Sequence, residues 1–220
     1  LWSDGAVSGV GATTWCNGFT GTSGNVSSSN SLIGGTTNDG TNLSVTVLPN
    51  GSYTVSRPKW NLPSPATTDV GAVTWCQADG PTTGVVSSAN SAHGSTAGDE
   101  VGVVHALADG RYAIACATWD DPVSSIPDAG IITIGDASAG LTGALDRNQS
   151  LVGATTGDLN SATFVQLTNG NQVLSLPGWD NPTSSLMNVG LVIFLKSRAN
   201  LIGSTNVTMG LTGSTSFDLV

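Results

Sequence analysis

Gly71-Ala-Val-Thr-Trp75 is the stretch that decides the fold, because variants of it recur along the chain at a nearly constant spacing. The four segments start 60, 59 and 60 residues apart, and the other three are Gly11-Ala-Thr-Thr-Trp15, Gly130-Ile-Ile-Thr-Ile134 and Gly190-Leu-Val-Ile-Phe194. A second glycine follows each opening glycine by 23 residues and an aspartate comes five residues later, giving Gly34 and Asp39, Gly94 and Asp99, Gly153 and Asp158, and Gly213 and Asp218. A tandem repeat of about 60 residues therefore organises the chain.

Three of the repeats also carry the signature of a β-hairpin. Asn-Gly or Asp-Gly lies between alternating apolar runs at Leu48-Pro-Asn50-Gly51, Leu107-Ala-Asp109-Gly110 and Leu167-Thr-Asn169-Gly170. Such dipeptides favour a type I′ turn, in which both central residues have positive φ. We therefore predict hairpin strands at 45–48 with 53–56, 103–107 with 112–116, and 163–167 with 172–176. The glycine-led segment then forms a third strand, and a short run ending at the second glycine, as at 31–34 and 150–153, forms a fourth.

The repeat length and the composition predict an all-β fold. Glu100 is the one glutamate, whereas Gly, Ser, Thr, Asn, Ala and Val dominate, so exposed helix faces are poorly supported. A four-stranded unit of this length fits a propeller blade better than a solenoid coil of roughly 20 to 45 residues. We expect tandem antiparallel, β-propeller-like units, about three and a half blades in one continuous domain: a half blade at 1–43, then blades at 44–101, 102–161 and 162–220. Val73, Ile132 and Val192, on the third strands, should be buried.

Charge and hydropathy bear on the setting of the protein. The 220 residues carry a formal net charge of −9 with 10% charged residues, which excludes a basic nucleic-acid-binding surface. No run of 18 apolar residues is present, so we expect no membrane insertion. Because the sequence begins with Leu1 and not with Met, we interpret its N-terminus as the product of processing or excision. Scarce Lys and Glu with abundant Ser, Thr, Asn and Gly are typical of secreted β-proteins, which favours an extracellular or cell-surface location.

The string Asn30-Ser-Leu-Ile-Gly-Gly35, followed by Asp39, a hairpin, Trp60 and the Gly71 segment, resembles tandem repeats of large bacterial surface and haemagglutinin-like adhesins. More distantly, it is similar to the integrin-type FG-GAP propeller blade. The resemblance implies an adhesive or structural role outside the cell. FG-GAP blades often carry a calcium loop with several Asp or Asn residues at alternate positions. The recurring aspartates stand here without such a cluster, so we expect no calcium and no cofactor.

One tryptophan precedes the third strand in every repeat, at Trp2, Trp60, Trp119 and Trp179. These rings are candidate ligand-binding residues, because a flat apolar face stacks on a sugar ring. The alternative, which we favour, is that one Trp at a fixed position packs between neighbouring repeats. The recurring aspartate is likewise more typical of a turn capped through backbone amides than of a metal ligand. Asn61, Asp120 and Asp180, directly after Trp, suggest Asx turns.

Nothing in the sequence points to catalysis, and we expect that the protein is not an enzyme and holds no metal. The acids outside the repeated positions form no spaced pair; they are Asp69, Asp79, Glu100, Asp121, Asp136 and Asp146. His93 and His105 have no metal-ligand spacing to each other or to a cysteine, and packing roles are expected for both. The chain has three cysteines, Cys16, Cys76 and Cys116, so at least one is outside any disulfide within the chain. No arrangement of His and Asn marks any of them as a catalytic nucleophile.

The first repeat contains the third and fourth strands, and its hairpin would lie upstream of Leu1. The chain is therefore either a piece of a longer array or a subunit completed by a neighbour. An open strand edge favours pairing with another chain, so we expect an extracellular structural or adhesive repeat protein whose partner is itself, in a multimer or filament. The second function class is a carbohydrate-binding propeller lectin with glycan partners. A lectin binds a glycan array and is inhibited by free sugar, whereas a scaffold forms multimers without ligand.

Overall fold

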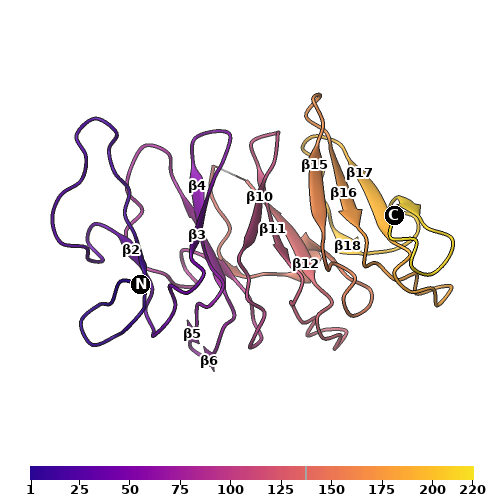
Figure 1. Cartoon of the computed structure of the whole chain (residues 1–220), viewed down its shortest axis with the longest axis horizontal. Coiled ribbons are helices and arrows are strands. Elements are labelled where there is room, and N and C mark those ends of the chain that lie inside the picture. The colour runs from indigo at the N-terminus through magenta and orange to yellow at the C-terminus, as the bar shows by residue number, and fades with distance from the viewer. Residues whose placement is uncertain (137) are drawn as a thin grey trace. The chain divides into compact units, whose positions relative to one another are not determined.

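The computed structural model describes residues 1–136 and 138–220, and in that part of the chain it contains no α-helix (Figure 1). The described residues form nineteen short strands and one 3-10 turn, Arg147–Gln149, which are joined by turns rich in glycine. None of these described elements is a helix with the length and hydropathy needed to span a bilayer. The predicted all-β class with tandem antiparallel units is confirmed.

The three hairpins lie where the sequence predicts them. They pair β3 (Ser44–Val47) with β4 (Tyr53–Arg57), β10 (Val103–Ala106) with β11 (Tyr112–Cys116), and β15 (Thr163–Gln166) with β16 (Gln172–Leu176).

The expected type I′ turn is wrong, because Gly51 has φ +86° while Asn50 keeps a negative φ. The Gly51 N–H bonds to the Leu48 carbonyl (2.9 Å), which makes a type I turn closed by a left-handed glycine. Pro49 suits this turn, since its ring fixes φ near −65°.

The third and fourth strands complete each antiparallel sheet. The third strands are β1 (Ala12–Thr13), β7 (Ala72–Cys76), β12 (Ile131–Gly135) and β17 (Leu191–Leu195). The fourth strands are β2 (Leu32–Ile33), β9 (Ala92–His93), β14 (Ser150–Val152) and β19 (Leu211–Thr212). Val73 and Ile132 are buried as expected, whereas Val192 is half-buried. A further hairpin, β5 (Leu62–Pro63) with β6 (Ala66–Thr67), lies before β7.

An additional strand in parallel orientation joins each of the first three sheets to the repeat that follows, and the sequence did not predict it. β8 (Gly84–Val85) pairs with β2, β13 (Gly143–Ala144) with β9, and β18 (Gly203–Ser204) with β14. Each of these dipeptides lies between the third and fourth strands of its own repeat. The sheets are therefore not self-contained blades, because every joint between two repeats is a shared β-ladder.

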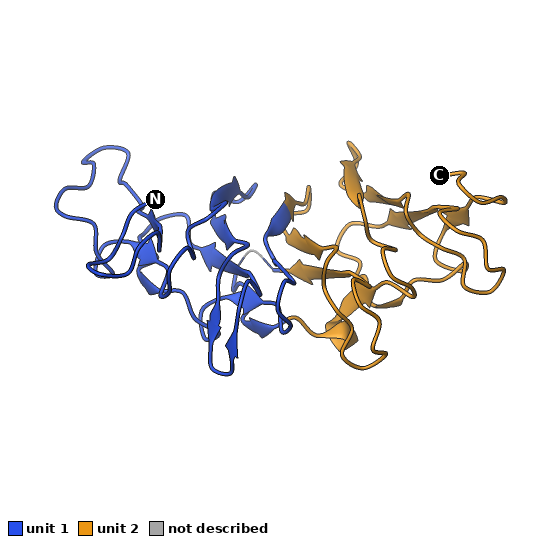
Figure 2. Ribbon diagram, turned by 60° about the horizontal axis from the view of Figure 1, so that its bottom comes forward, with its two compact units in different colours: residues 1–104, 136–144 blue, residues 105–135, 145–220 orange. Residues whose placement is uncertain are grey.

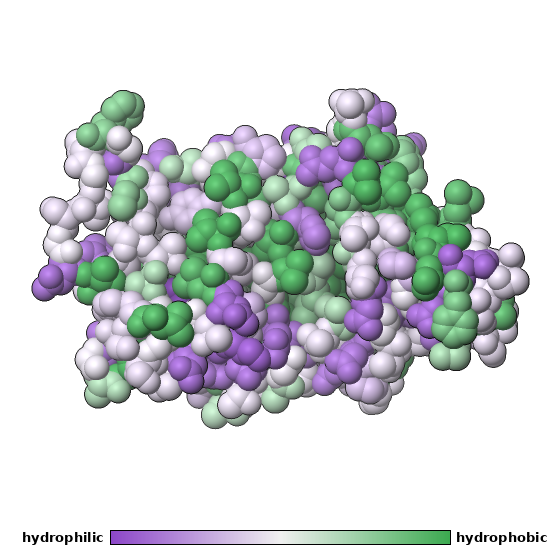
Figure 3. Space-filling view, in the orientation of Figure 1, coloured by the Kyte–Doolittle hydropathy of each residue, from purple (hydrophilic) through white to green (hydrophobic). Residues whose placement is uncertain are grey.

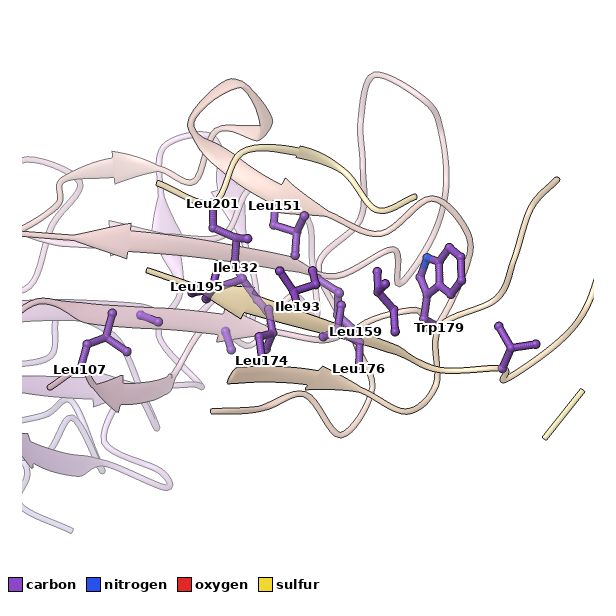
Figure 4. Packing of buried hydrophobic residues seen from close by; sticks show 14 residues of the cluster. Leu107, Ile132, Leu151, Leu159, Leu174, Leu176, Trp179, Ile193, Leu195 and Leu201 are labelled. Atoms are coloured by element: carbon purple, nitrogen blue, oxygen red, sulfur yellow. The ribbon is translucent and has the colours of Figure 1, made fainter. Parts of the chain in front are cut away.

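The chain divides into two compact units, residues 1–104 with 136–144 and residues 105–135 with 145–220 (Figure 2). The first unit has a core around Trp60, Leu32 and Val55. In the second, Figure 4 shows Ile132, Leu174 and Ile193 meeting from three strands, with Trp179 at one end of the cluster. Each unit thus buries apolar side chains from two successive repeats, and the joint ladders hold those repeats in register.

Candidate functional site

The recurring tryptophans are core residues in three of the four repeats. Trp60, Trp119 and Trp179 are 1%, 1% and 0% exposed, and the Trp60 ring lies 5.6 Å from that of His93. A sealed ring has no face to offer a sugar, so the burial of these three rings argues against ligand binding and agrees with a packing role in the core. Trp2 is half-buried and has the one indole of the set with a free surface.

The recurring aspartates cap turns, as predicted. Asp158 Oδ2 accepts from the backbone N–H of Ala154 (2.7 Å) and Thr155 (3.0 Å), and Oδ1 accepts from the Thr155 hydroxyl (2.6 Å). The same three bonds recur around Asp39, Asp99 and Asp218. A carboxylate with two or three donors is satisfied without a metal. In the described residues no group of three or more His, Cys, Asp or Glu is placed to hold an ion.

The polar residue after each Trp does more than close a local turn. Asn61 Oδ1 accepts from the backbone N–H of Asp69 (2.8 Å), and Asp180 Oδ1 accepts from that of Asn188 (2.7 Å). Both bonds span eight residues, so the expected Asx turn, which reaches two residues ahead, is wrong here. The Asp180 N–H also donates to Asp158 Oδ1 (3.0 Å), which ties the Trp loop to the aspartate turn.

The joint between repeats follows a recurring hydrogen-bond pattern. The Gly84 N–H donates to the Ser31 carbonyl (3.1 Å), and the Val86 N–H donates to the Ile33 carbonyl (2.9 Å). The last joint repeats this pattern, with the Thr205 N–H on the Val152 carbonyl (2.9 Å). Gly84 adopts φ +107° and Gly203 φ +116°, a conformation that an L side chain rarely adopts, which explains the glycine that leads each joint strand.

Side chains seal each joint on both sides. On the fourth strands, the residues that pair with the leading glycine of a joint strand are Leu32, Ala92 and Leu151, and they are 1%, 1% and 0% exposed. The residues that follow the joint dipeptides, Val86, Leu145 and Thr205, are 3%, 7% and 2% exposed. Thr205 also donates its hydroxyl to Asp158 Oδ2 (3.1 Å), so the last joint is anchored to the aspartate turn of the repeat before it.

Arg57 is a structural residue that sequence reasoning missed. Its guanidinium is fully buried and donates to the carbonyls of Val10 (2.8 Å) and Leu32 (3.0 Å) in the first repeat. Burial lowers its pKa to about 10, and the nearby Asp39 opposes that shift. Cys116 and Leu176 occupy the same position in the later repeats, so a break in the repeat pattern was the available signal.

Both histidines and two of the three cysteines lie in packed surroundings. The rings of His105 and Phe164 are in tilted contact with centroids 5.1 Å apart, and burial lowers the pKa of His105. Cys16, Cys76 and Cys116 form no disulfide with one another; Cys16 is exposed and the other two are buried. Burial raises the pKa of Cys76, which disfavours the nucleophilic thiolate.

The remaining acids hold loops or pair with cations. Asp121 forms an ion pair with Arg147 (2.6 Å). Lys59 forms ion pairs with Asp69 (3.5 Å) and with Glu100. Asp136 accepts from the backbone N–H of Ser138, and Asp146 accepts from that of Asn148, so both cap turns. Asp109 accepts from two arginines, since the Arg111 side chain and the Arg198 backbone both donate to it at 2.8 Å. Burial raises the pKa of Asp109, but these hydrogen bonds outweigh it and the net pKa lies below the ordinary value.

A family model described as a repeat of unknown function, DUF5650, matches residues 1–42, 47–103, 106–161 and 166–220. The chain belongs to the DUF5650 repeat family. No curated protein and no solved structure shows significant similarity to it.

The geometry gives the DUF5650 repeat three structural features. A Trp lies before the third strand, an aspartate caps the turn after the fourth strand, and a glycine-led segment lies between those two strands. In three of the four repeats this segment forms the joint with the preceding repeat. The features act together, because the Trp loop, the aspartate turn and the joint are linked through Asp158, Asp180 and Thr205.

Proposed function

We propose that this DUF5650 protein is a structural repeat protein of the cell exterior that associates with further copies through open strand edges. The observation that carries the proposal is the parallel ladder at each joint, as between β9 and β13. Such a ladder uses backbone groups and a small apolar contact, so any repeat with a free edge offers the same binding surface.

Two sheet edges among the described residues support association. β1 pairs with β2 alone, whereas its counterpart β7 also pairs with the hairpin strand β4. Beside β1 lies a groove of about 350 Å³ lined in part by Trp2, Ala12 and Leu43. β19 is the second edge, because the parallel neighbour that covers β9 and β14 is absent beside it in the described chain. Unpaired edge strands are templates for pairing with another chain.

An extracellular setting and an adhesive role belong to the same proposal. They are supported by the composition and by the resemblance of the repeats to bacterial surface adhesins. The lectin alternative loses its main support, because three of its four candidate tryptophans are sealed in the core. Trp2 remains the one half-exposed member of the set and does not make a repeated sugar site.

Sedimentation velocity over a range of protein concentrations, followed by electron microscopy, tests the proposal. We expect the weight-average sedimentation coefficient to rise with concentration and multimers to appear without added ligand. A glycan array run in parallel separates the two functions. A monomer at every concentration, or multimers that free sugar dissolves, would overturn the scaffold proposal.

A further inference from the structure

We infer that the segment 17–26 of one copy docks on the β19 edge of a second copy, with Gly24 opposite Leu211. The inference rests on the proposed self-association and names its interface and partner. It is drawn from the three joints that the chain forms internally, because they show what covers a fourth strand and which segment does so.

The receiving side is exposed in the last repeat. Leu211 pairs with Val192 on β17, as Leu151 pairs with Ile132 on β12, so the two leucines are equivalent. Leu151 is 0% exposed and Leu211 is 78% exposed. Thr212 is the equivalent of Val152, whose carbonyl accepts from the next repeat. The edge therefore displays the surface that β18 covers one repeat earlier.

The docking side is exposed in the first repeat. Val26 follows Gly24 and Asn25 as Val86 follows Gly84 and Val85, yet Val26 is 37% exposed where Val86 is 3% exposed. Gly24 already has φ +110°, close to the +107° of Gly84. The backbone is thus preset for the joint before any partner binds, which lowers the ordering cost of association.

The loop before Gly24 has the conformation of a docked segment. The Gly21 N–H bonds to the Asn17 carbonyl (2.8 Å), as the Gly140 N–H bonds to the Asp136 carbonyl (3.2 Å), and the two glycines have φ +70° and +67°. Residues 136–144 belong to the first compact unit, although their neighbours on both sides belong to the second. This segment is therefore packed with the preceding repeat, and segment 17–26 is its counterpart.

An apolar surface surrounds the receiving edge. Phe194 is 54% exposed and Ile202 50% exposed, and together with Met209 they line a groove of about 350 Å³. Apolar side chains also gather over the last repeat in Figure 3. The equivalent of Phe194 in the second repeat is Trp75, and Gly140 of the docked segment lies so close to it that a Cβ on Gly140 would be 2.7 Å from the Trp75 Cβ. Gly21 is the residue that would cover Phe194.

The internal joints also define the register of the new one. Gly84 lies opposite Leu32 and Val85 opposite Ile33, which places Gly24 opposite Leu211 and Asn25 opposite Thr212. We expect the Gly24 N–H to donate to the Gly210 carbonyl and the Val26 N–H to donate to the Thr212 carbonyl. The contact joins two different surfaces, so it is heterologous and leaves one free site of each kind on a pair.

Two variants of the full chain test the interface, Val26→Asp on the docking side and Leu211→Asp on the receiving side. Each side chain is exposed, so neither change should unfold the chain, and far-UV circular dichroism with an unfolding curve checks this. We expect each variant alone to lose the concentration-dependent rise in sedimentation coefficient. A 1:1 mixture should form a heterodimer that does not grow, because it restores one intact interface.

Val123→Asp is the matched control, since Val123 is 72% exposed and lies outside the joint. It should assemble as the unmodified chain does. A short bifunctional thiol reagent then checks the register by joining Asn25→Cys to Thr212→Cys, both in a Cys16→Ser background.

The outcomes separate the two proposals. If the unmodified chain never assembles, both proposals fail. If it assembles and either Asp variant assembles equally well, the docking interface is wrong while the scaffold proposal stands. If both Asp variants block assembly and their mixture also stays monomeric, the two sites do not bind each other and the assignment of segment 17–26 to the β19 edge is overturned.

Discussion

Leu151 and Leu211 occupy the same place in two successive repeats, yet the first is fully buried and the second is 78% exposed. The difference comes from β18, which runs parallel to β14 and has no counterpart beside β19 in the described chain. Local sequence is not its cause, because both strands pair with their own third strand in the same register.

Leu151→Ala should lower the free energy of unfolding by about 2–5 kcal/mol, because it opens a cavity in a packed core. Leu211→Ala should change it by less than about 0.5 kcal/mol, as is usual at exposed positions. Urea unfolding at a concentration where the protein is monomeric measures both. Equal losses from the two variants would show that burial does not differ between the two repeats.

Asp158→Asn should destabilise the chain by about 1–3 kcal/mol, since the buried turn loses part of a charge-assisted hydrogen-bond set. Asp218→Asn is the matched control, because Asp218 makes the same bonds to Ser214 and Thr215 in an exposed turn. We expect a smaller loss there, since water replaces the lost bonds. Thermal unfolding compares the two, and a larger loss at Asp218 would contradict the role given to burial.

Trp179→Ala should cost about 3–5 kcal/mol, because the indole is fully buried in the core of the second unit. Trp2→Ala, at the equivalent half-buried position, should cost clearly less. Urea denaturation followed by circular dichroism tests the pair. A Trp179→Ala protein of unchanged stability with altered glycan-array binding would return the sugar-stacking interpretation to consideration.

Arg57→Met should loosen the first repeat, because the carbonyls of Val10 and Leu32 lose a charged donor worth about 1.5–3 kcal/mol per bond. Hydrogen exchange should rise in residues 1–43 more than in 162–220. Arg198→Met, at an exposed position, serves as the control and should leave both regions unchanged. Uniform exchange across the chain would show that Arg57 does not hold the two repeats together.

Asp109 should make stability sensitive to acid. Its folded-state pKa lies below the ordinary value of 3.8, so the unfolded chain binds the proton more readily as pH falls. Its stabilising contribution is complete above the unfolded-state pKa and is lost as pH falls through the folded-state pKa. Urea midpoints from pH 6 to 2 should therefore fall less steeply in Asp109→Asn than in the unmodified chain. Asp79→Asn, at an exposed turn, is the matched control variant, and an unchanged slope in Asp109→Asn would refute the assignment.

The sequence by itself determined the repeat, the hairpins and the aspartate turns. These are local features: an Asn-Gly or Asp-Gly dipeptide closes a turn within five residues, and Asp158 caps amides three and four residues before it. Such contacts depend on side-chain chemistry and short loops, which a repeat of about 60 residues displays in every copy. Even there, the turn type differs from the expected type I′, because Gly51 takes a positive φ and Asn50 does not.

The tertiary structure alone decided the joints and the role of Arg57. A two-residue strand such as Gly84–Val85 has no apolar period, and its partner Leu32–Ile33 lies some fifty residues earlier in the chain. Its pairing is fixed by packing of the two repeats together, through Val86 and the sheet edge, rather than by its own propensity. The exposure of Leu211 and Val26 is decided in the same way, because burial at a joint depends on whether a neighbouring repeat is present and not on the residues that form the strand.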